Sequence, residues 1–268
     1  MVSPRLVAKI ESEEPTLRLA VLIDADNAQA AVIEGLLAEI AKFGEATVRR
    51  IYGDFTASTS SSWKKVLQQH AIKPVQQFAY TTGKNATDST LIIDAMDLLY
   101  TRKFDGFCLV TSDSDFTGLA MRLREEGILV LGFGEKKTPG AFRNACHKFL
   151  STEVLRPGKA AEPFDQTLNV ESGQKPSTPS LAAEAAEQKL EFPKEFILTA
   201  LEQSSDDAGW ANLGTFGSYL TKLQPDFDSR LYGYKKLSDL VKARSDLFVI
   251  EERKAIGSDQ KVLYLRSK

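Results

Sequence analysis

The sequence predicts a three-layer α/β domain with a central parallel sheet, joined by a flexible linker to a small winged helix-turn-helix domain. Three observations lead to this prediction. Short apolar runs alternate with segments of helical periodicity over the first 155 residues. A stretch rich in proline, glycine and serine follows, and beyond it three helical patterns precede two strand patterns. The alternating first part is typical of a parallel sheet covered by helices on both faces.

Five apolar runs in the first domain predict buried strands because turn residues bound them closely. These runs are residues 19–23, 47–52, 72–78, 107–111 and 128–133. The segments of helical periodicity that follow them are residues 28–42, 60–70, 89–100, 116–126 and 140–150. We expect Asp88 to be the N-cap of the third of these helices and Gly127 to end the fourth.

The remaining chain predicts a linker and a second domain. Residues 156–191 contain four prolines among glycine, serine and threonine, which is typical of a flexible linker. Helical patterns follow around residues 196–201, 213–223 and 234–243, and residues 247–251 and 261–265 form a predicted β-hairpin. We therefore expect domains at residues 18–155 and 192–266.

The composition predicts a soluble, cytoplasmic protein. The chain has 268 residues, a formal net charge of −2, no apolar run long enough to span a membrane, and no apolar signal-peptide core. The two cysteines, Cys108 and Cys146, lie in apolar or amphipathic contexts and are expected to be buried thiols.

Acidic residues gather where a parallel sheet would bring them together. Asp24, Asp26 and Asn27 follow the first strand, Asp113 and Asp115 follow the fourth, and Asp88 opens a helix. The ligand site of such a sheet lies beyond the carboxyl ends of its strands, so these groups are expected to converge. Crowded carboxylates repel one another unless a cation neutralises them, and Mg²⁺ or Mn²⁺ prefers oxygen ligands. Each aspartate alone is compatible with an ordinary turn or cap, but Asp24, Asp88 and Asp113 together indicate a site.

Three motifs in the first domain resemble those of the NYN domain, a PIN-like nuclease fold, of the LabA-like group. The motifs are LIDADN at residues 22–27, KNATDSTLIIDAMD at 84–97 and TSDSDF at 111–116. The resemblance covers residues 18–155 and implies Mg²⁺- or Mn²⁺-dependent ribonuclease chemistry. It implies catalytic roles for Asp24, Asn27, Asp88, Asp113 and Asp115, the four aspartates being the metal ligands. Asp94 lies on a different helix face from Asp88, and we expect it to support the site rather than bind the ion.

A nuclease of this kind must also hold a phosphate backbone. Lys84 precedes Asp88 by four residues and is the sharpest candidate for a phosphate contact. Lys64 lies beside Trp63, whose ring is a candidate for stacking an RNA base. The alternatives are that Trp63 anchors its helix in the core and that the lysines form a solvated face.

The C-terminal domain resembles an OST-HTH/LOTUS domain. The resemblance rests on WANLGTFGSYL at residues 210–220 and, most specifically, on GYKKLSDL at residues 233–240. It implies RNA binding or docking of a protein partner. Gly233 is expected to allow a tight entry to the third helix, and Lys235 and Lys236 are candidates for the RNA-binding surface. Alternatively, these lysines are simply solvated.

Two other functions remain open at this point. The first domain could be a non-catalytic RNA-binding or adaptor module that no longer cuts. Alternatively, Asp24 and Asp26 after a strand suit the aspartyl nucleophile of a haloacid-dehalogenase-like phosphatase, although Asn27 and the close spacing of Asp113 and Asp115 depart from that family's pattern.

Overall fold

The computed structural model of the chain describes residues 16–56, 61–78, 86–156, 192–254 and 261–268. The chain divides into two compact units. A six-stranded sheet belongs to the first and a three-stranded sheet to the second. None of the helices within the described ranges has the length and apolar character needed to cross a bilayer.

The first unit is built on a fully parallel sheet of six strands in the order β3-β2-β1-β4-β5-β6. The strands are β1 (Arg18–Asp24), β2 (Glu45–Gly53), β3 (Lys73–Gln76), β4 (Gly106–Val110), β5 (Leu129–Gly134) and β6 (Lys148–Ser151). All five predicted strands are therefore confirmed. The order places β1 between β2 and β4, which is the switch point of a doubly wound sheet, where ligand sites form beyond the strand ends.

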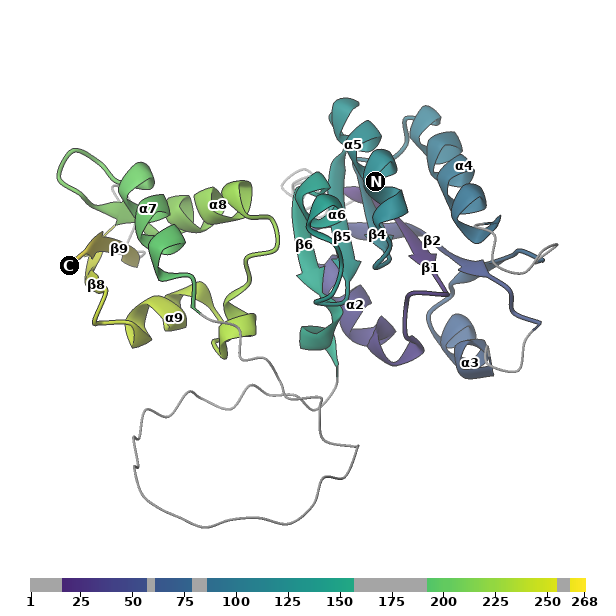
Figure 1. Cartoon of the computed structure of the whole chain (residues 1–268), viewed down its shortest axis with the longest axis horizontal. Coiled ribbons are helices and arrows are strands. Elements are labelled where there is room, and N and C mark those ends of the chain that lie inside the picture. Colours follow the sequence, from purple (N-terminus) through teal and green to yellow (C-terminus); the bar gives the residue numbers. More distant parts are fainter. Residues whose placement is uncertain (1–15, 57–60, 79–85, 157–191, 255–260) are drawn as a thin grey trace, which may run out of the picture. The chain divides into compact units, whose positions relative to one another are not determined.

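Helices cover both faces of this sheet and confirm the three-layer prediction (Figure 1). On one face lie α4 (Ala86–Tyr100), α5 (Thr117–Glu125) and α6 (Gly140–Ala145). On the other lie the 3₁₀ turn η1 (Ala30–Val32), α2 (Ile33–Ile40) and α3 (Ser61–Gln69). Alternate residues of β1 explain this arrangement, since Ala20 and Leu22 pack with the first set and Val21 and Ile23 with the second.

The sixth strand corrects the prediction of a helix over residues 140–150. The helix α6 ends at Ala145, and Cys146 is already extended (φ −86°, ψ 156°). His147 then pairs with Val130 of β5: its amide donates to the Val130 carbonyl at 2.9 Å, and its Nδ1 accepts from the Val130 amide at 3.0 Å. Buried Phe149 and Leu150 follow on β6. Sheet pairing therefore overrides the helical periodicity of this segment.

The ends of two helices test further predictions. Gly127 has a φ of +74° and its amide donates to the Arg124 carbonyl at 2.9 Å, so the predicted stop after α5 is confirmed. The prediction that Asp88 is the N-cap of α4 is wrong, because the described helix begins at Ala86 and Asp88 lies in its first turn.

The second unit contains helices packed on a small antiparallel sheet with strand order β7-β9-β8. Its elements are α7 (Lys194–Ser204), β7 (Ala211–Asn212), α8 (Leu213–Leu223), the 3₁₀ turn η5 (Ser229–Tyr232), α9 (Leu237–Ala243), β8 (Phe248–Lys254) and β9 (Lys261–Ser267), although the last three residues of α8 are grouped with the first unit. Ile197, Phe216, Leu240 and Leu265 are buried in this unit. Three helices followed by a hairpin confirm the predicted winged helix-turn-helix architecture.

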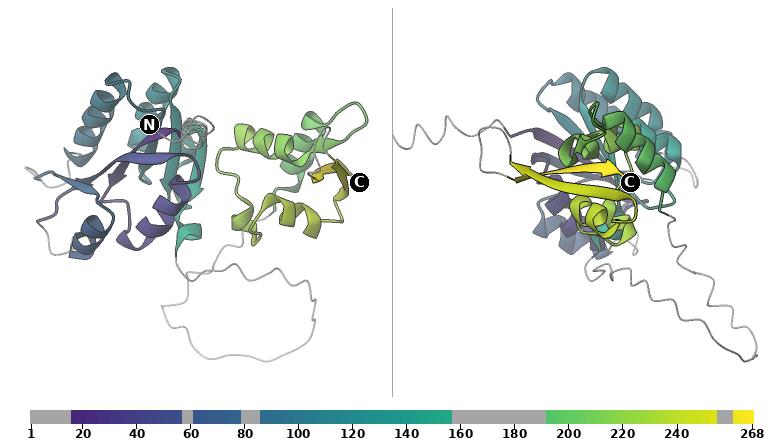
Figure 2. Two further views of the ribbon diagram at one scale, coloured as in Figure 1. Left: turned by 180° about the vertical axis from the view of Figure 1, so that it is seen from behind. Right: turned by 90° about the vertical axis from the view of Figure 1, so that its left-hand side faces the viewer.

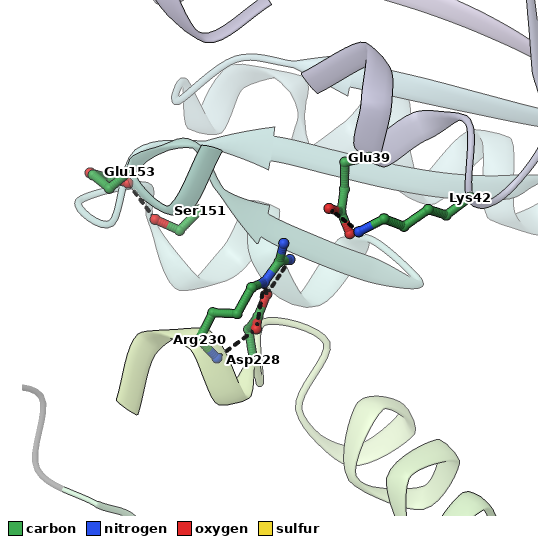
Figure 3. A network of polar contacts seen from close by, with 6 residues as sticks. All are labelled: Glu39, Lys42, Ser151, Glu153, Asp228 and Arg230. Carbon is green, nitrogen blue, oxygen red and sulfur yellow. Dashed lines mark hydrogen bonds and ion pairs between the residues drawn. The ribbon is translucent and has the colours of Figure 1, made fainter. Parts of the chain in front are cut away.

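The entry to α9 differs from the prediction in detail. Residues 234–236 do not belong to the helix, which begins at Leu237 with Lys236 extended as its N-cap. Before it, Asp228 caps η5, accepting from the Arg230 amide at 2.9 Å and pairing with the Arg230 guanidinium at 2.6 Å (Figure 3). Gly233 has a φ of +89°, a left-handed conformation that favours glycine, but it ends η5 and does not itself form the predicted entry to α9, which begins four residues later.

Candidate functional site

The candidate site lies at the carboxyl ends of β1 and β4. Asp24 is the last residue of β1, and Thr111 directly follows β4. The register pairs Ile23 with Val110, so these two chain ends leave the sheet side by side. Residues distant in sequence are thereby brought to the switch point of the sheet.

Asp24 is fully shielded from solvent, with an exposed fraction of 0%. Its Oδ1 accepts a hydrogen bond from the Asp26 amide at 3.0 Å. Its Oδ2 accepts from Asn27 Nδ2 at 2.7 Å and from Thr111 Oγ1 at 2.9 Å. Burial raises the pKa of Asp24 above its usual value, while the hydrogen bonds from Asn27 and Thr111 act in the opposite direction.

A chain of hydrogen bonds runs from Asp24 into the loop after β4. Thr111 Oγ1 donates to Asp24 and also accepts from the Asp113 amide at 3.1 Å. Asp113 Oδ1 in turn accepts from the Asp115 amide at 2.9 Å and caps the 3₁₀ turn η3 (Ser114–Phe116). Asp24 therefore orders the segment that carries the next two carboxylates.

Asp88, Asp113 and Asp115 each place a carboxylate oxygen within 4.8 Å of the others. Asp88 and Asp113 are half-buried and Asp115 is exposed. Burial, followed by repulsion from Asp24, Asp113 and Asp115, raises the pKa of Asp88 to about 6. Within the described ranges, no other group of three such side chains comes this close together. Three carboxylates at this spacing fit a hard divalent cation, which takes oxygen ligands.

The helix that carries Asp88 is tied to β2 by a second polar network. Asp94 of α4 accepts hydrogen bonds from the Arg50 guanidinium and from the hydroxyl of Tyr52. Tyr52 is fully buried and pairs with Asp24 in the register of β1 and β2. Burial, followed by the hydrogen bond to Asp94, raises the pKa of Tyr52. This network fixes α4 beside the end of β1, so Asp94 supports the structure, as its position in the helix indicates.

The predicted RNA-binding residues differ in their exposure to solvent. Trp63 is 5% exposed and packs in the core with α2 and β1, so its ring has no free face on which to stack a base, and that prediction is wrong. The apolar contacts of the indole on α3 explain its presence. Lys64 is exposed on the same helix, whereas Lys84 lies outside the described residues. In the second unit, Lys235 and Lys236 are both exposed.

Thr111, Tyr52 and Arg50 were not predicted as parts of this arrangement. Thr111 was assigned to the end of a buried strand, which it follows directly. Its hydroxyl reaches Asp24 across 87 positions of sequence because β1 and β4 are neighbours. A polar residue directly after an apolar run, two positions before Asp113, is the signal that could have marked it.

Comparison with known protein families now identifies both units. Residues 18–153 match the NYN domain model. The chain belongs to the NYN domain family. NYN domains are PIN-like nucleases, and PIN-like nuclease domains generally use divalent metals. Residues 188–257 of this NYN protein match the OST-HTH/LOTUS domain, and domains of that kind bind RNA.

Three solved structures are similar to parts of this NYN protein. An uncharacterized protein of Nitrosomonas europaea, solved by NMR, is 73% identical and covers 36% of this chain and 92% of its own, with a TM-score of 0.29. A protein of unknown function from Vibrio parahaemolyticus is 15% identical and covers 52% of this chain and 95% of its own, with a TM-score of 0.44. A fragment (175–257) of a Chromobacterium violaceum protein, also solved by NMR, is 30% identical and covers 30% of this chain and 84% of its own, with a TM-score of 0.24. No curated protein matches the chain.

Proposed function

We propose that this NYN protein is a divalent-metal-dependent ribonuclease whose C-terminal winged helix binds the RNA. The observation that carries the proposal is the trio of Asp88, Asp113 and Asp115 oxygens within 4.8 Å of one another at the switch point of a parallel sheet. Desolvation and mutual repulsion raise the pKa of Asp88, so ionising all three carboxylates is costly without a cation. Mg²⁺ or Mn²⁺ would offset this cost.

In this proposal Asp88, Asp113 and Asp115 hold the ion. When bound, the ion supplies Lewis acidity and an activated water for attack on a phosphodiester. The charge of Asp24 acts on Asp88, and its hydrogen bond keeps Thr111, and through it the Asp113 backbone, in place. Asn27, oriented by its bond to Asp24, is assigned as a polar contact for the scissile phosphate. The fold thus contributes mainly by holding the three carboxylates in place, and such positioning of reacting groups supplies a large part of the rate of phosphoryl-group reactions.

Substrate binding is assigned to four lysines. The exposed Lys64 on α3 and Lys84, which lies outside the described residues, are proposed to contact phosphates in the NYN domain, and the exposed Lys235 and Lys236 to do so in the winged helix. The proposal takes RNA as the substrate because the OST-HTH/LOTUS domain, an RNA-binding module, is on the same chain.

The environment of Asp24 argues against the phosphatase alternative. An aspartyl nucleophile must present a free carboxylate oxygen to the phosphorus atom. Asp24 has an exposed fraction of 0%, and both of its oxygens already accept hydrogen bonds. It is therefore suited to ordering the site and not to attacking a phosphate.

The test is cleavage of end-labelled single-stranded RNA by the purified full chain with Mn²⁺, Mg²⁺ or EDTA. We expect cleavage with a divalent ion and none in EDTA. Asp113→Asn should abolish cleavage while keeping the fold, because asparagine can still cap η3 and accept from the Asp115 amide. The matched control is Asp97→Asn, an exposed aspartate of α4 outside the trio, which should cut at the wild-type rate.

Two results would contradict the proposal. Cleavage that persists in EDTA or in Asp113→Asn would place the chemistry elsewhere. Tight RNA binding without cleavage under any metal condition would instead support the non-catalytic adaptor function.

A further inference from the structure

The outer face of the three-stranded sheet in the second unit carries a row of aromatic and arginine side chains. Tyr264 and Arg266 are two residues apart on β9 and so point to one side of the sheet. Tyr264 pairs with Glu251 of β8, which brings Arg253, two residues further on, to the same side. Trp210 directly precedes β7, whose Ala211 pairs with Leu265, so it lies beside Arg266.

These side chains contact one another continuously. The Arg253 guanidinium carbon lies 4.7 Å from the Trp210 ring centroid and 4.6 Å from the Tyr264 ring centroid. The Arg266 guanidinium carbon lies 5.0 Å from the Trp210 ring centroid. We call Tyr264, Arg253, Trp210 and Arg266 the aromatic–arginine row. Each contact is within the range of a cation–π interaction, so the row is ordered before any ligand arrives.

The row faces solvent rather than the core of its unit. The opposite face of the sheet carries the buried side chains of Phe248 and Leu265. In the row, Trp210 and Tyr264 are partly exposed, the Arg253 side chain is 35% exposed, and Arg266 is exposed. The right-hand view of Figure 2 looks at the unit from the side where β8 and β9 lie across its front.

The charge of this face favours a polyanion. Among the residues of β8 and β9 that share this face, Arg253 and Arg266 are basic and Glu251 is acidic. Glu251 is paired with Arg253 at 3.0 Å. Arg266 has no carboxylate partner among the residues that the structure describes, so its guanidinium edge is available to a phosphate.

We propose that the aromatic–arginine row binds single-stranded RNA, with bases stacking on its rings and guanidinium planes and phosphates meeting Arg266. The proposal rests on the proposed function only in taking RNA as the ligand. Unpaired bases can stack on aromatic rings and on arginine planes, whereas the bases of a duplex are already stacked inside it. This surface is distinct from Lys235 and Lys236, which precede α9.

The experiment measures RNA binding by the full chain in EDTA, so that binding is separated from cleavage. The probe is a fluorescein-labelled single-stranded oligo-uridine of 12 nucleotides, followed by anisotropy at fixed salt. Arg266→Gln and Tyr264→Ala should each weaken binding about tenfold, as loss of a stacking residue does. Arg266→Gln is an exposed change that is expected to fold normally. The matched control is Arg244→Gln, which removes a guanidinium 4.3 Å from the Phe192 ring elsewhere in the unit and should leave binding unchanged.

Stacking has its own readout in tryptophan fluorescence. The chain has two tryptophans, of which Trp63 is buried and Trp210 lies in the row. RNA should quench the wild-type emission, and Trp210→Phe should remove that quenching. An abasic oligonucleotide of the same length and the matching RNA duplex should both bind more weakly than oligo-uridine.

Unchanged oligo-uridine binding in both Arg266→Gln and Tyr264→Ala would overturn the proposal. So would equal affinity for the abasic strand, or use of the row by a protein partner in place of RNA. None of these results depends on nuclease activity, which is scored separately with Mn²⁺. Loss of cleavage with intact row-dependent binding would remove only the proposed function.

Discussion

At the scale of single residues, the carboxylate of Asp24 is fixed by hydrogen-bond donors of the protein itself. Its buried carboxylate accepts from Asp26, Asn27 and Thr111, and these three bonds define both the turn after β1 and the start of the loop after β4. The trio of Asp88, Asp113 and Asp115 is a different case, since its carboxylate oxygens lie within 4.8 Å of one another and repulsion from its neighbours helps to raise the pKa of Asp88. The two groups should therefore respond differently to loss of charge.

Asp24→Asn should destabilise the protein. Each Asp24 oxygen faces a hydrogen-bond donor, so the amide NH₂ of asparagine must point at one of them. A buried donor left without an acceptor costs about 1–3 kcal/mol, and we expect that fall in the free energy of unfolding measured with urea. Asp26→Asn, at an exposed neighbouring position, should change it by less than about 0.5 kcal/mol. Equal urea midpoints for Asp24→Asn and the wild type would contradict the hydrogen-bond assignment.

Asp88→Asn should have the reverse effect on the metal-free protein. Burial and neighbouring carboxylates raise the pKa of Asp88 to about 6, so its ionised form at neutral pH destabilises the fold. Removing the charge should raise Tm in EDTA. Mn²⁺ should raise the Tm of the wild type, because it binds the folded trio, and should do so much less in Asp88→Asn. A Tm shift with Mn²⁺ that is the same in both proteins would show that the ion binds elsewhere.

At the scale of elements, α4 depends on its attachment to β2. Asp94 accepts from Arg50 and Tyr52 within one half-buried network, and Asp88 lies on the same helix nearer its start. Tilting α4 would move Asp88 relative to Asp113 and Asp115, which come from the loop after β4. The Asp94 network is thus a structural support for the trio of Asp88, Asp113 and Asp115.

Tyr52→Phe tests this support without changing any carboxylate. Loss of the hydroxyl removes one of the hydrogen bonds to Asp94, and a hydrogen bond to a charged group contributes about 1.5–3 kcal/mol. We expect a decrease of that size in the free energy of unfolding and a lower cleavage rate with Mn²⁺. Tyr100→Phe, at an exposed tyrosine of the same helix, is the control and should change both quantities little. A normal cleavage rate in a measurably destabilised Tyr52→Phe would separate the network from the site.

The sequence predicts correctly those elements that a short stretch of residues determines by itself. The buried strands read as apolar runs, and the acidic residues after β1 and β4 read as a site because parallel strands end at one edge of the sheet. The sequence does not predict β6 because most of its four residues continue the helical periodicity of residues 140–150. They form a strand because they pair with β5. The role of Thr111 depends on the neighbourhood of β1 and β4, and the burial of Trp63 depends on what packs against α3. Both depend on contacts between elements that are distant in sequence, which a single sequence does not reveal.

At the scale of the whole molecule, the charge is arranged locally. The formal net charge of −2 gives no long-range attraction for RNA, and the proposed catalytic site is itself acidic. If the chain cuts RNA as proposed, it needs basic and aromatic surface elsewhere to hold its substrate. The second unit offers such surfaces in Lys235, Lys236 and the aromatic–arginine row. We therefore propose a division of labour in which the NYN domain cuts and the OST-HTH/LOTUS domain binds.

Truncation after Arg156 tests this division. The six-stranded sheet, the trio of Asp88, Asp113 and Asp115 and both supporting networks lie within residues 18–156. The fragment should therefore fold and retain metal-dependent cleavage of generic single-stranded RNA at saturating substrate. Its Kd for RNA in EDTA should be about tenfold or more weaker than that of the full chain, because the stacking and phosphate contacts of the second unit are gone. The two proteins must be compared at the same salt concentration, since phosphate contacts make affinity steeply salt-dependent.

A well-folded fragment that binds RNA as tightly as the full chain would assign the second unit to a protein partner. A well-folded fragment that cannot cleave at any RNA concentration would show that the second unit contributes to the catalytic site, because saturating substrate compensates for weak binding but not for a missing catalytic group.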